Sequence, residues 1–241
     1  MSAPVPFILN SAEKYVIKAF SLGRQEFSNS WDIQKKLWKK RSSGELSNDV
    51  LLFLEHEPIF TLGVGGNEEN VLSRISPLNG DIVPLQRINR GGEVTYHGPG
   101  QLMVYAIFDL RNYSKDVHAH CRKLEEIFVR YSYKIGIHVK RKDKNPGLWK
   151  DDIKIMSLGI GVRRWITMHG VAFNVCPDLS FFQMINPCGF VDEKIGSLQS
   201  LKLNVPSIDE LISDIIPICE EVFGNKITDC GLDDLDEILL N

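Results

Sequence analysis

The segment NRGGEVTYHGPGQ, residues 89–101, holds four glycines, a proline, a histidine and an arginine between two apolar runs. Glycine adopts backbone conformations closed to other residues and lets a ligand lie against the main chain. Proline stiffens the loop and removes a backbone donor. Such a segment is costly to order and fills a core poorly. Its composition therefore indicates a loop that wraps around a bound molecule.

Apolar runs of strand length lie on both sides of this loop. Residues 50–54, 59–62 and 102–108 are predicted strands. Residues 153–175 hold β-branched apolar side chains with little helical period, which predicts at least two strands arranged as a hairpin. Asn145-Pro146-Gly147, just before them, is predicted to be a turn.

Helical periodicity appears in three other parts of the chain. The predicted helices span residues 22–41, ending at Ser42-Ser43-Gly44, residues 114–133, capped by Ser114, and a stretch from Ser207 to about Gly224. Ser207 and Glu210 match a capping box, and the acidic tail from Asp229 is predicted to be a short helix or a loose end. No repeat or linker composition divides the chain. The sequence therefore predicts one α+β domain over residues 1–241, with a mixed β-sheet flanked by helices.

The composition excludes several function classes. Hydrophobic residues make up 43% and charged residues 24% of the 241 residues, as in a globular protein with a real core. The net charge of −3 argues against a nucleic-acid binder with a strongly basic surface. No run approaches the roughly 18 apolar residues of a membrane span, and residues 1–10 lack the basic start of a secretory signal. Five scattered cysteines without a CxxC pair predict free thiols in a reducing cytoplasm.

Cys188 is the first candidate for chemistry, in the segment INPCGF at residues 185–190. The proline before it fixes the chain and the glycine after it leaves an open backbone N–H, which suits a nucleophile with an oxyanion site. The same pattern also fits a tight turn around a small buried thiol. Because a thiol with a pKa near 8.5 is only a few per cent ionised at pH 7, a catalytic cysteine needs a helper. The candidates are His97, His169 and Lys154.

Lys154 begins the apolar strand pattern KIMSLG at residues 154–159. A lysine there is either a strand-edge residue that reaches out to water or a functional amine. His118-Ala119-His120-Cys121 could suggest a metal site, but on a helix these spacings do not bring all three side chains to one face. We therefore predict a coincidence on a helix surface. No phosphate-binding GxxxxGK[ST] loop is present, and the sequence predicts neither a metal nor a cofactor.

Several motifs in one order resemble the octanoyltransferase family over roughly residues 50–200. They are LEHEP at 54–58 with TLG at 61–63, RGGEVTYHGPGQ at 90–101, KIMSLG at 154–159, HGVAFNV at 169–175 and NPCG at 186–189. The resemblance implies the α+β catalytic fold shared with biotin and lipoate protein ligases. It implies transfer of an octanoyl group from octanoyl-acyl carrier protein to lipoyl domains, in lipoate biosynthesis and protein lipoylation. The implied acceptors are the E2 subunits of 2-oxoacid dehydrogenases and the glycine cleavage H protein. The implied location is the cytoplasm, or the mitochondrial matrix if the chain is eukaryotic.

The resemblance also assigns residues by position. Cys188 matches the nucleophile that carries the acyl thioester, and Lys154 matches the lysine that lowers the pKa of that thiol. The acyl site is matched by Arg90, Gly91, Gly92, Glu93, Val94, Thr95, Tyr96, His97, Ser157, Leu158, Gly159, Gly170, Val171 and Ala172. Met156 and Val171 depart from the residues common in the family, which leaves the acyl-chain preference open. Arg163 and Arg164, expected on opposite faces of a strand, offer one arginine to an acidic partner.

Other activities remain possible from the sequence. An ATP-dependent lipoate or biotin ligase would share the fold but would generally lack a catalytic cysteine. An amidotransferase would use the same cysteine with a lipoyl donor, and a thioesterase would hydrolyse the acyl group without an acceptor. A non-catalytic module that binds acyl carriers is disfavoured by the presence of both Cys188 and Lys154.

Overall fold

The computed structural model describes residues 16–142, 145–186, 194–201 and 205–240. Most of its strands form one mixed sheet in the order β12-β1-β2-β6-β10-β9-β8-β7, and β11 pairs with β9 off this path. β1 runs parallel to β2 and β12, and β11 runs parallel to β9, whereas the other pairs are antiparallel. The strands are β1 (Ile17–Gln25), β2 (Asp49–His56), β6 (Gln101–Ile107), β7 (Lys140–Lys142), β8 (Asn145–Lys150), β9 (Ile153–Arg163), β10 (Ile166–Asn174), β11 (Lys194–Ile195) and β12 (Ile227–Cys230).

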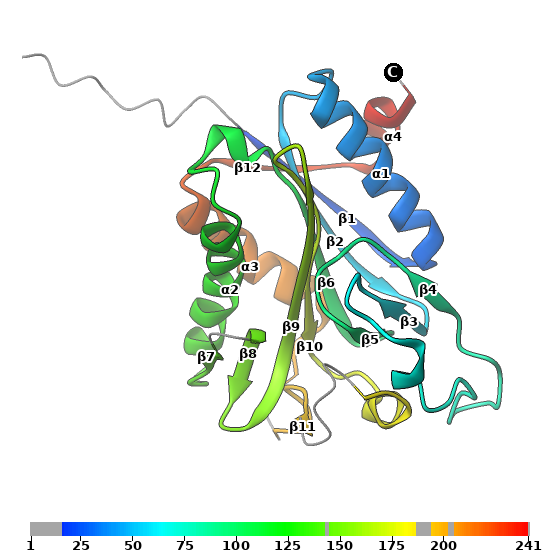
Figure 1. Ribbon diagram of the computed structural model, residues 1–241. Helices are drawn as coiled ribbons and strands as arrows, with labels where there is room; N and C mark the ends of the chain where they lie inside the picture. Colours follow the sequence, from blue (N-terminus) through cyan, green and yellow to red (C-terminus); the bar gives the residue numbers. More distant parts are fainter. Residues whose placement is uncertain (1–15, 143–144, 187–193, 202–204, 241) are drawn as a thin grey trace, which may run out of the picture.

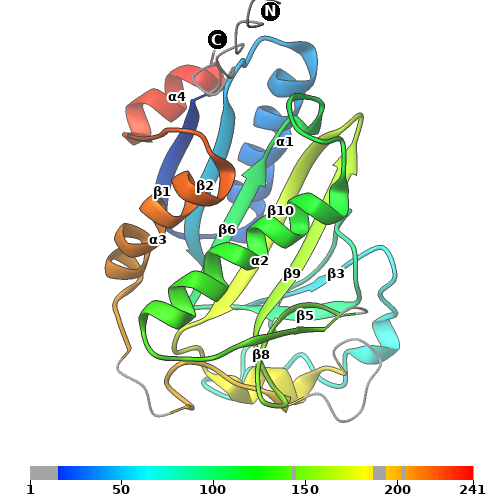
Figure 2. The ribbon, with the colours of Figure 1, turned by 90° about the vertical axis from the view of Figure 1, so that its left-hand side faces the viewer.

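Helices cover both faces of this sheet (Figures 1 and 2). One face carries α2 (Val117–Lys134) and α3 (Ile208–Phe223), and the other carries α1 (Phe27–Ser43) and α4 (Leu232–Leu240). Below α1, a second sheet in the order β4-β3-β5 lies against the same face. Its strands are β3 (Ile59–Leu62), β4 (Leu85–Arg87) and β5 (Val94–His97). The structure therefore confirms the predicted α+β class and its mixed sheet.

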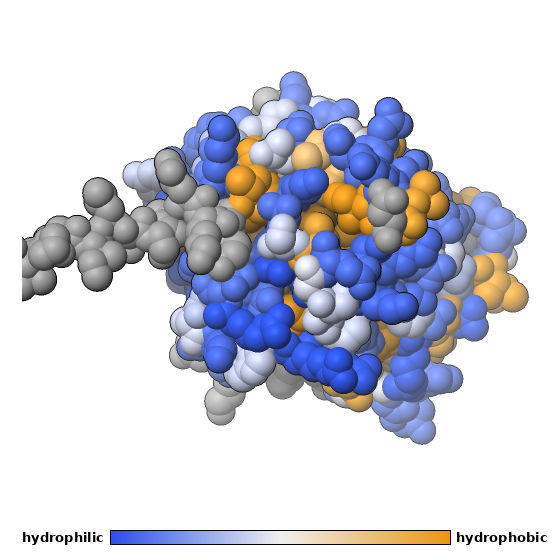
Figure 3. Space-filling view, turned by 90° about the horizontal axis from the view of Figure 1, so that it is seen from above, coloured by the Kyte–Doolittle hydropathy of each residue, from blue (hydrophilic) through white to orange (hydrophobic). Residues whose placement is uncertain are grey.

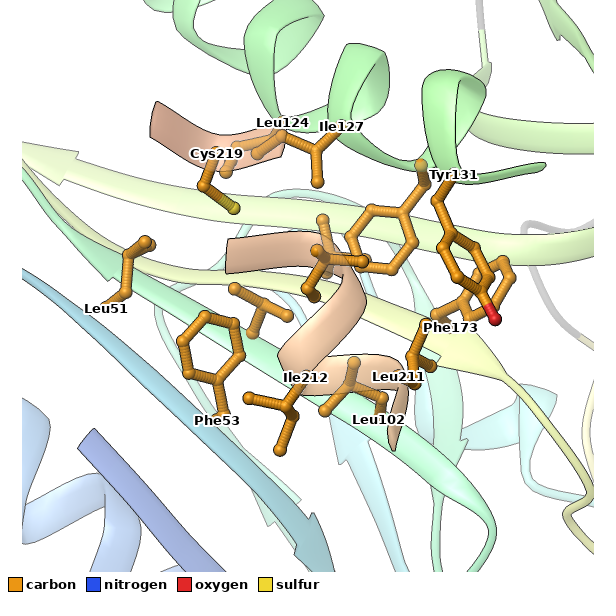
Figure 4. Close-up of a cluster of buried hydrophobic side chains, with 14 of the residues drawn as sticks. Leu51, Phe53, Leu102, Leu124, Ile127, Tyr131, Phe173, Leu211, Ile212 and Cys219 are labelled. Atoms are coloured by element: carbon orange, nitrogen blue, oxygen red, sulfur yellow. The ribbon is translucent and has the colours of Figure 1, made fainter. Parts of the chain in front are cut away.

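The largest core lies between the main sheet and the pair α2 and α3 (Figure 4). Side chains alternate between the two faces of each strand. Leu51 and Phe53 of β2 accordingly enter this core, whereas Leu52 faces the smaller core under α1. The predicted capping box begins α3, since the Ser207 hydroxyl accepts from the backbone N–H of Glu210 while the Glu210 carboxylate accepts from that of Ser207.

Two predicted helix boundaries are wrong, although the helices exist. Residues 22–25 belong to β1, because pairing with β2 outweighs the helical pattern of this stretch. The second helix is capped by Asp116, not by Ser114, since the Asp116 carboxylate accepts from the N–H of Ala119. The first helix ends as predicted at Gly44, which has a left-handed φ of 88°. The acidic tail contains the helix α4.

The predicted turn at Asn145-Pro146-Gly147 is also wrong, because all three residues belong to β8. Asn145 pairs with Lys142 of β7, so the connection between these strands lies earlier in the chain. The hairpin of β9 and β10 is confirmed, and its turn is Arg164-Trp165. Both turn residues have positive φ angles, which suits the twist of a two-residue hairpin. Arg164 is therefore in a turn, and the strand geometry predicted for Arg163 and Arg164 is wrong for Arg164.

His120 does not lie on the helix surface, contrary to the prediction for residues 118–121. It is buried against the rings of Phe108 and Phe223, because the inner face of α2 turns it toward the core. In the described part of the chain, no group of three His, Cys, Asp or Glu side chains could hold a metal ion. No helix in that part is long and apolar enough to cross a bilayer. The end of the molecule near β12 and α4 is mostly hydrophilic, with scattered hydrophobic patches (Figure 3).

Candidate active site

A cavity of about 300 Å³ lies where the small sheet meets the main sheet. One wall is the glycine-rich loop with the start of β5, and the opposite wall comes from β6, β9 and β10. The first turns of α2 and the start of α1 also reach it, through Val117, Cys121 and Phe27. The glycine-rich loop thus forms the wall of a hollow, as its composition predicts.

Close contacts between main chains hold this loop against β9. The N–H of Gly91 donates to the carbonyl of Ile160 at 2.9 Å. A Cβ atom at Gly159 would lie 2.9 Å from the carbonyl oxygen of Gly91 and 3.2 Å from the Cδ of Arg90. Only glycine allows such an approach of one backbone to another. Gly159 is therefore needed for this wall, whereas a Cβ at Gly91 would make only an ordinary contact, 3.7 Å from the Ile160 carbonyl.

Arg90 anchors the loop to β3. The guanidinium is nearly buried, and its Nη2 donates to the carbonyl of Thr61 at 2.7 Å and to the hydroxyl of the same residue at 2.9 Å. Its Nη1 donates to the carbonyl of Gly91 at 3.0 Å. Charge-assisted bonds of this kind are among the stronger hydrogen bonds in proteins. Arg90 therefore fixes the shape of the loop while its side chain also lines the cavity.

His97 and His169 line the same cavity. The ring nitrogens of His97 lie 3.2 Å from Gln101 Oε1 and 3.2 Å from Thr61 Oγ1. Burial lowers the pKa of His97 well below its usual range, and burial lowers the pKa of His169 to about 3. Both rings are therefore neutral at pH 7, and their hydrogen bonds hold them as parts of the wall.

Lys154 lies at the other end of the cavity, at the start of β9. The residue is 4% exposed, and its Nζ donates to Asn145 Oδ1 at 2.9 Å. The same nitrogen lies 5.0 Å from the ring centre of Trp149. Lys154 is therefore a lysine held against the cavity and not one that reaches out to water.

Cys188 lies outside the described residues, as do the proline before it and the glycine after it. The described chain resumes at Lys194, in β11. There Lys194 pairs with Ile153, and Ile195 pairs with Lys154. The chain therefore runs beside Lys154 within seven positions after Cys188.

The structure brings most of the predicted substrate-binding residues to the cavity. Those that line it are Arg90, Gly91, Gly92, Glu93, Val94, Thr95, His97, Ser157, Leu158, Gly159, Gly170 and Ala172. Tyr96 and Val171 do not line it. Tyr96 stacks on Phe181 with ring centres 4.5 Å apart, and Val171 enters the core under α2 and α3. Both positions alternate with lining residues along a strand, so their side chains point away.

Several lining residues escaped the sequence reasoning. Met103 and Tyr105 come from the run at 102–108, where every position is apolar and no face stands out. Phe27 and Cys121 come from helices distant in sequence, so only the fold brings them here. Lys142, on β7, belongs to the basic run KRK at residues 140–142, which by itself indicates only a solvated face. Because every position of this run is apolar, nothing in the sequence distinguishes Met103 and Tyr105 from their neighbours.

Comparisons with known proteins agree on one family. The model of the lipoyl protein ligase A/B catalytic domain matches residues 26–218. An octanoyltransferase from Thermoanaerobacter sp. (strain X514) is 39% identical over 90% of this chain and 95% of its own length. An octanoyltransferase from Geobacter metallireducens is 42% identical over 75% of this chain and 81% of its own.

Solved structures show the same fold. A putative lipoate protein ligase from T. acidophilum with bound lipoic acid has a TM-score of 0.70 at 16% identity, covering 93% of this chain and 92% of the other. A lipoate-protein ligase A bound with ATP has a TM-score of 0.71 at 16% identity, covering 93% of this chain and 92% of the other. The predicted similarity to the ligase fold is therefore confirmed.

Proposed function

The chain belongs to the octanoyltransferase family, which transfers octanoyl groups to lipoyl domains in protein lipoylation, and we propose that Cys188 and Lys154 perform this transfer through a covalent thioester. The observation that carries the proposal is the position of Lys154. Its ammonium lies against the cavity, and β11, which begins six residues after Cys188, pairs with its strand. A chain of six residues spans at most roughly 20 Å, which leaves this end of the cavity within the reach of Cys188.

In the first half of the reaction, the Cys188 thiolate attacks the carbonyl carbon of the octanoyl thioester. The Lys154 ammonium beside it favours the thiolate over the thiol. Backbone N–H groups near the nucleophile stabilise the oxyanion of the tetrahedral intermediate. The carbon–sulfur bond to the donor then breaks, and the donor thiolate takes a proton from the Lys154 ammonium. The octanoyl group remains on Cys188, and Lys154 is left as the neutral amine.

In the second half, the ε-amino group of the acceptor lysine attacks the acyl-Cys188 thioester. This amine must first lose a proton, and the neutral form of Lys154 accepts it. An amide bond forms as the attacking nitrogen releases its second proton to solvent, and Cys188 leaves as a thiolate beside the Lys154 ammonium. Because a thioester is converted into an amide, the transfer needs no ATP.

The acyl chain occupies the cavity between the glycine-rich loop and β10. Met103, Ala172 and Ile88 give this region an apolar surface. Burying the chain contributes on the order of 0.8 kcal/mol for each CH₂ group. The neutral rings of His97 and His169 place no charge beside it. The donor in this proposal is octanoyl-acyl carrier protein. The acceptors are lipoyl domains of E2 subunits and the H protein, in the cytoplasm or, in a eukaryote, in the mitochondrial matrix.

Intact-mass analysis tests the proposal. The protein is mixed with octanoyl-acyl carrier protein, and a lipoyl domain is added afterwards. We expect an octanoyl mass shift that maps to Cys188, is discharged by the acceptor and is absent from Cys188→Ala. Transfer that continues in Cys188→Ala would refute the thioester route. A requirement for ATP would favour the ligase chemistry of the structural relatives.

A further inference from the structure

Trp149 is directly opposite Lys154 in the main sheet. It is the cross-strand partner of Lys154 on β9 and of Lys140 on β7. Directly paired residues on neighbouring strands place their side chains on the same face. Figure 2 shows β8 beside β9, below α2. The indole ring is therefore a direct neighbour of the lysine.

A β-bulge creates this pairing. Leu148 pairs with Met156, but the next residue, Trp149, pairs with Lys154, so Ile155 is an extra residue on β9. A bulge changes the direction of a side chain and often lies next to an active site. Without it, Trp149 would face Ile155, whose side chain packs in the large core. The bulge therefore brings Lys154 onto the indole.

Two cations lie over this one ring. The Nζ of Lys154 is 5.0 Å from the ring centre and the Nζ of Lys142 is 4.8 Å from it. Both distances are within the range at which the negative face of an indole attracts a cation. Lys142 and Lys154 both line the cavity, whereas Trp149 does not.

The burial of Trp149 shows that the ring is kept at a cost. The residue is fully buried, and its indole Nε1 has no hydrogen-bond partner among the described residues. An unsatisfied buried donor is unfavourable, and phenylalanine would fill much of this space without one. Indole has the strongest cation-binding face of the aromatic side chains. The advantage of tryptophan over phenylalanine at this position is therefore its stronger attraction for a cation.

We propose that Trp149 is a positioning residue for the acyl transfer, whose ring face holds the Lys154 ammonium at the cavity wall while Asn145 fixes its direction. This rests on the proposed role of Lys154. Trp149 does not line the cavity, so its effect on the reaction passes through the lysine over its ring. Lowering the electron density of the ring face should slow the acylation of Cys188 and leave the binding of the octanoyl donor unchanged.

Site-specific incorporation of fluorotryptophans at position 149 tests this proposal. Each added fluorine withdraws electron density from the ring face and leaves its shape nearly unchanged. We expect the rate of Cys188 acylation to fall stepwise with fluorine number, by about tenfold across the series. The KM for octanoyl-acyl carrier protein and the melting temperature should stay constant. Equal rates across the series would overturn the proposal.

Trp38 provides the matched control. It has a cation over its ring, with the Arg163 guanidinium carbon 5.6 Å from the ring centre, and a buried Nε1 without a partner among the described residues. It belongs to α1, packs against the smaller core under this helix and does not line the cavity. The same fluorine series at position 38 should leave the acylation rate unchanged, and a matching decline there would overturn the proposal.

Simple substitutions give an independent readout. Trp149→Phe should lose less activity than Trp149→Leu at equal donor KM, because only the first keeps an aromatic face. Lys154→Ala in the unfluorinated protein separates the two hypotheses. If Lys154→Ala retains full activity, the proposed function fails. If it is inactive and the fluorine series is flat, only the role of Trp149 fails.

Discussion

The two ends of the cavity differ in the charge of the side chains that line them. The end formed by β7, β8 and β9, which we call the chemical end, presents the ammonium groups of Lys142 and Lys154. The end formed by α1 and β6, the acyl end, presents Phe27, Met103 and neutral histidine rings. A charged group is costly to bury without a partner, whereas an alkyl chain gains from burial. The Arg90 guanidinium also lines the cavity, but Thr61 and Gly91 accept its hydrogen bonds. The two lysines therefore mark one end of the cavity and the apolar side chains mark the other.

The largest predicted effect comes from a substitution that keeps the positive charge at position 154 but removes the ability to accept a proton. Lys154→Arg should reduce octanoyl transfer by about a thousandfold, because arginine stays protonated and cannot accept a proton. Binding of the octanoyl donor should change little, since the acyl end is intact. Single-turnover transfer and donor affinity are the measurements. Lys150→Arg, on β8 beside Asp151, is the matched control and should retain parental activity. Full activity in Lys154→Arg would remove the acid–base role.

The second prediction concerns the stability lost on acidification because buried histidines near the acyl end stay neutral in the folded protein. Burial lowers the pKa of His56 to about 4 and that of His169 to about 3, from 6.5. Between pH 6.5 and these values the unfolded chain binds protons that the folded protein does not. Stability therefore falls as the pH falls, by about 1.4 kcal/mol per pH unit for each histidine. Denaturant unfolding from pH 7 to pH 5 measures this loss.

His120 gives a control for the pH prediction. Its pKa is lowered by burial to about 4, and it lies outside the cavity lining. His120→Phe should reduce the pH dependence of unfolding by the equivalent of one proton. Donor binding should be unaffected, because the acyl end keeps its own histidines. An unchanged pH slope in this variant would contradict the assignment of a neutral buried His120.

The third prediction concerns a substitution that loosens the contact between the glycine-rich loop and β9, which joins the two ends of the cavity. Gly159→Ala places a methyl group 2.9 Å from the Gly91 carbonyl, so the loop must move off β9. We expect a loss of about 1–3 kcal/mol in the free energy of unfolding and a higher KM for the donor. Gly231→Ala adds a methyl with only an ordinary contact, 3.7 Å from Asp234, and should change neither quantity. Wild-type stability and KM in Gly159→Ala would contradict the close packing.

The smallest prediction concerns chain length at the acyl end. Ala172→Leu fills part of the cavity and should reduce octanoyl transfer by about tenfold, with a smaller effect on a butanoyl donor. Val171→Ala, one residue earlier, removes packing from the opposite face of β10. It should lower stability by about 2 kcal/mol and leave the chain-length preference unchanged. A changed preference in Val171→Ala would show that the two faces are coupled. Transfer assays with donors of both lengths decide this.

Much of the site could be predicted because its composition is unusual. The glycine-rich loop is poor at filling a core, and the pattern at 153–175 is typical of paired strands, so both were located correctly. The residues at 22–25 were misassigned because a helix follows β1 almost without a break. Local periodicity cannot show that a parallel strand will pair with such a segment.

Other parts of the site depend on contacts between distant segments. Phe27 and Cys121 reach the cavity from helices on opposite faces of the main sheet. The bulge at Ile155 depends on the register between β8 and β9, which no single strand specifies. Tyr96 and Val171 were included because motifs were carried over as blocks, whereas strand alternation sends every second side chain away. Cys188 stays a prediction, since it lies outside the described residues.

The pairing of β1 with β12 constrains how the protein is made. Ile17 lies beside Ile227, more than two hundred positions later. During synthesis, one border of the main sheet stays open until ribosomes have translated nearly all of the described chain. Such long-range pairing slows folding and leaves a strand edge exposed to wrong partners. Chaperone dependence during translation is the cellular consequence that we expect.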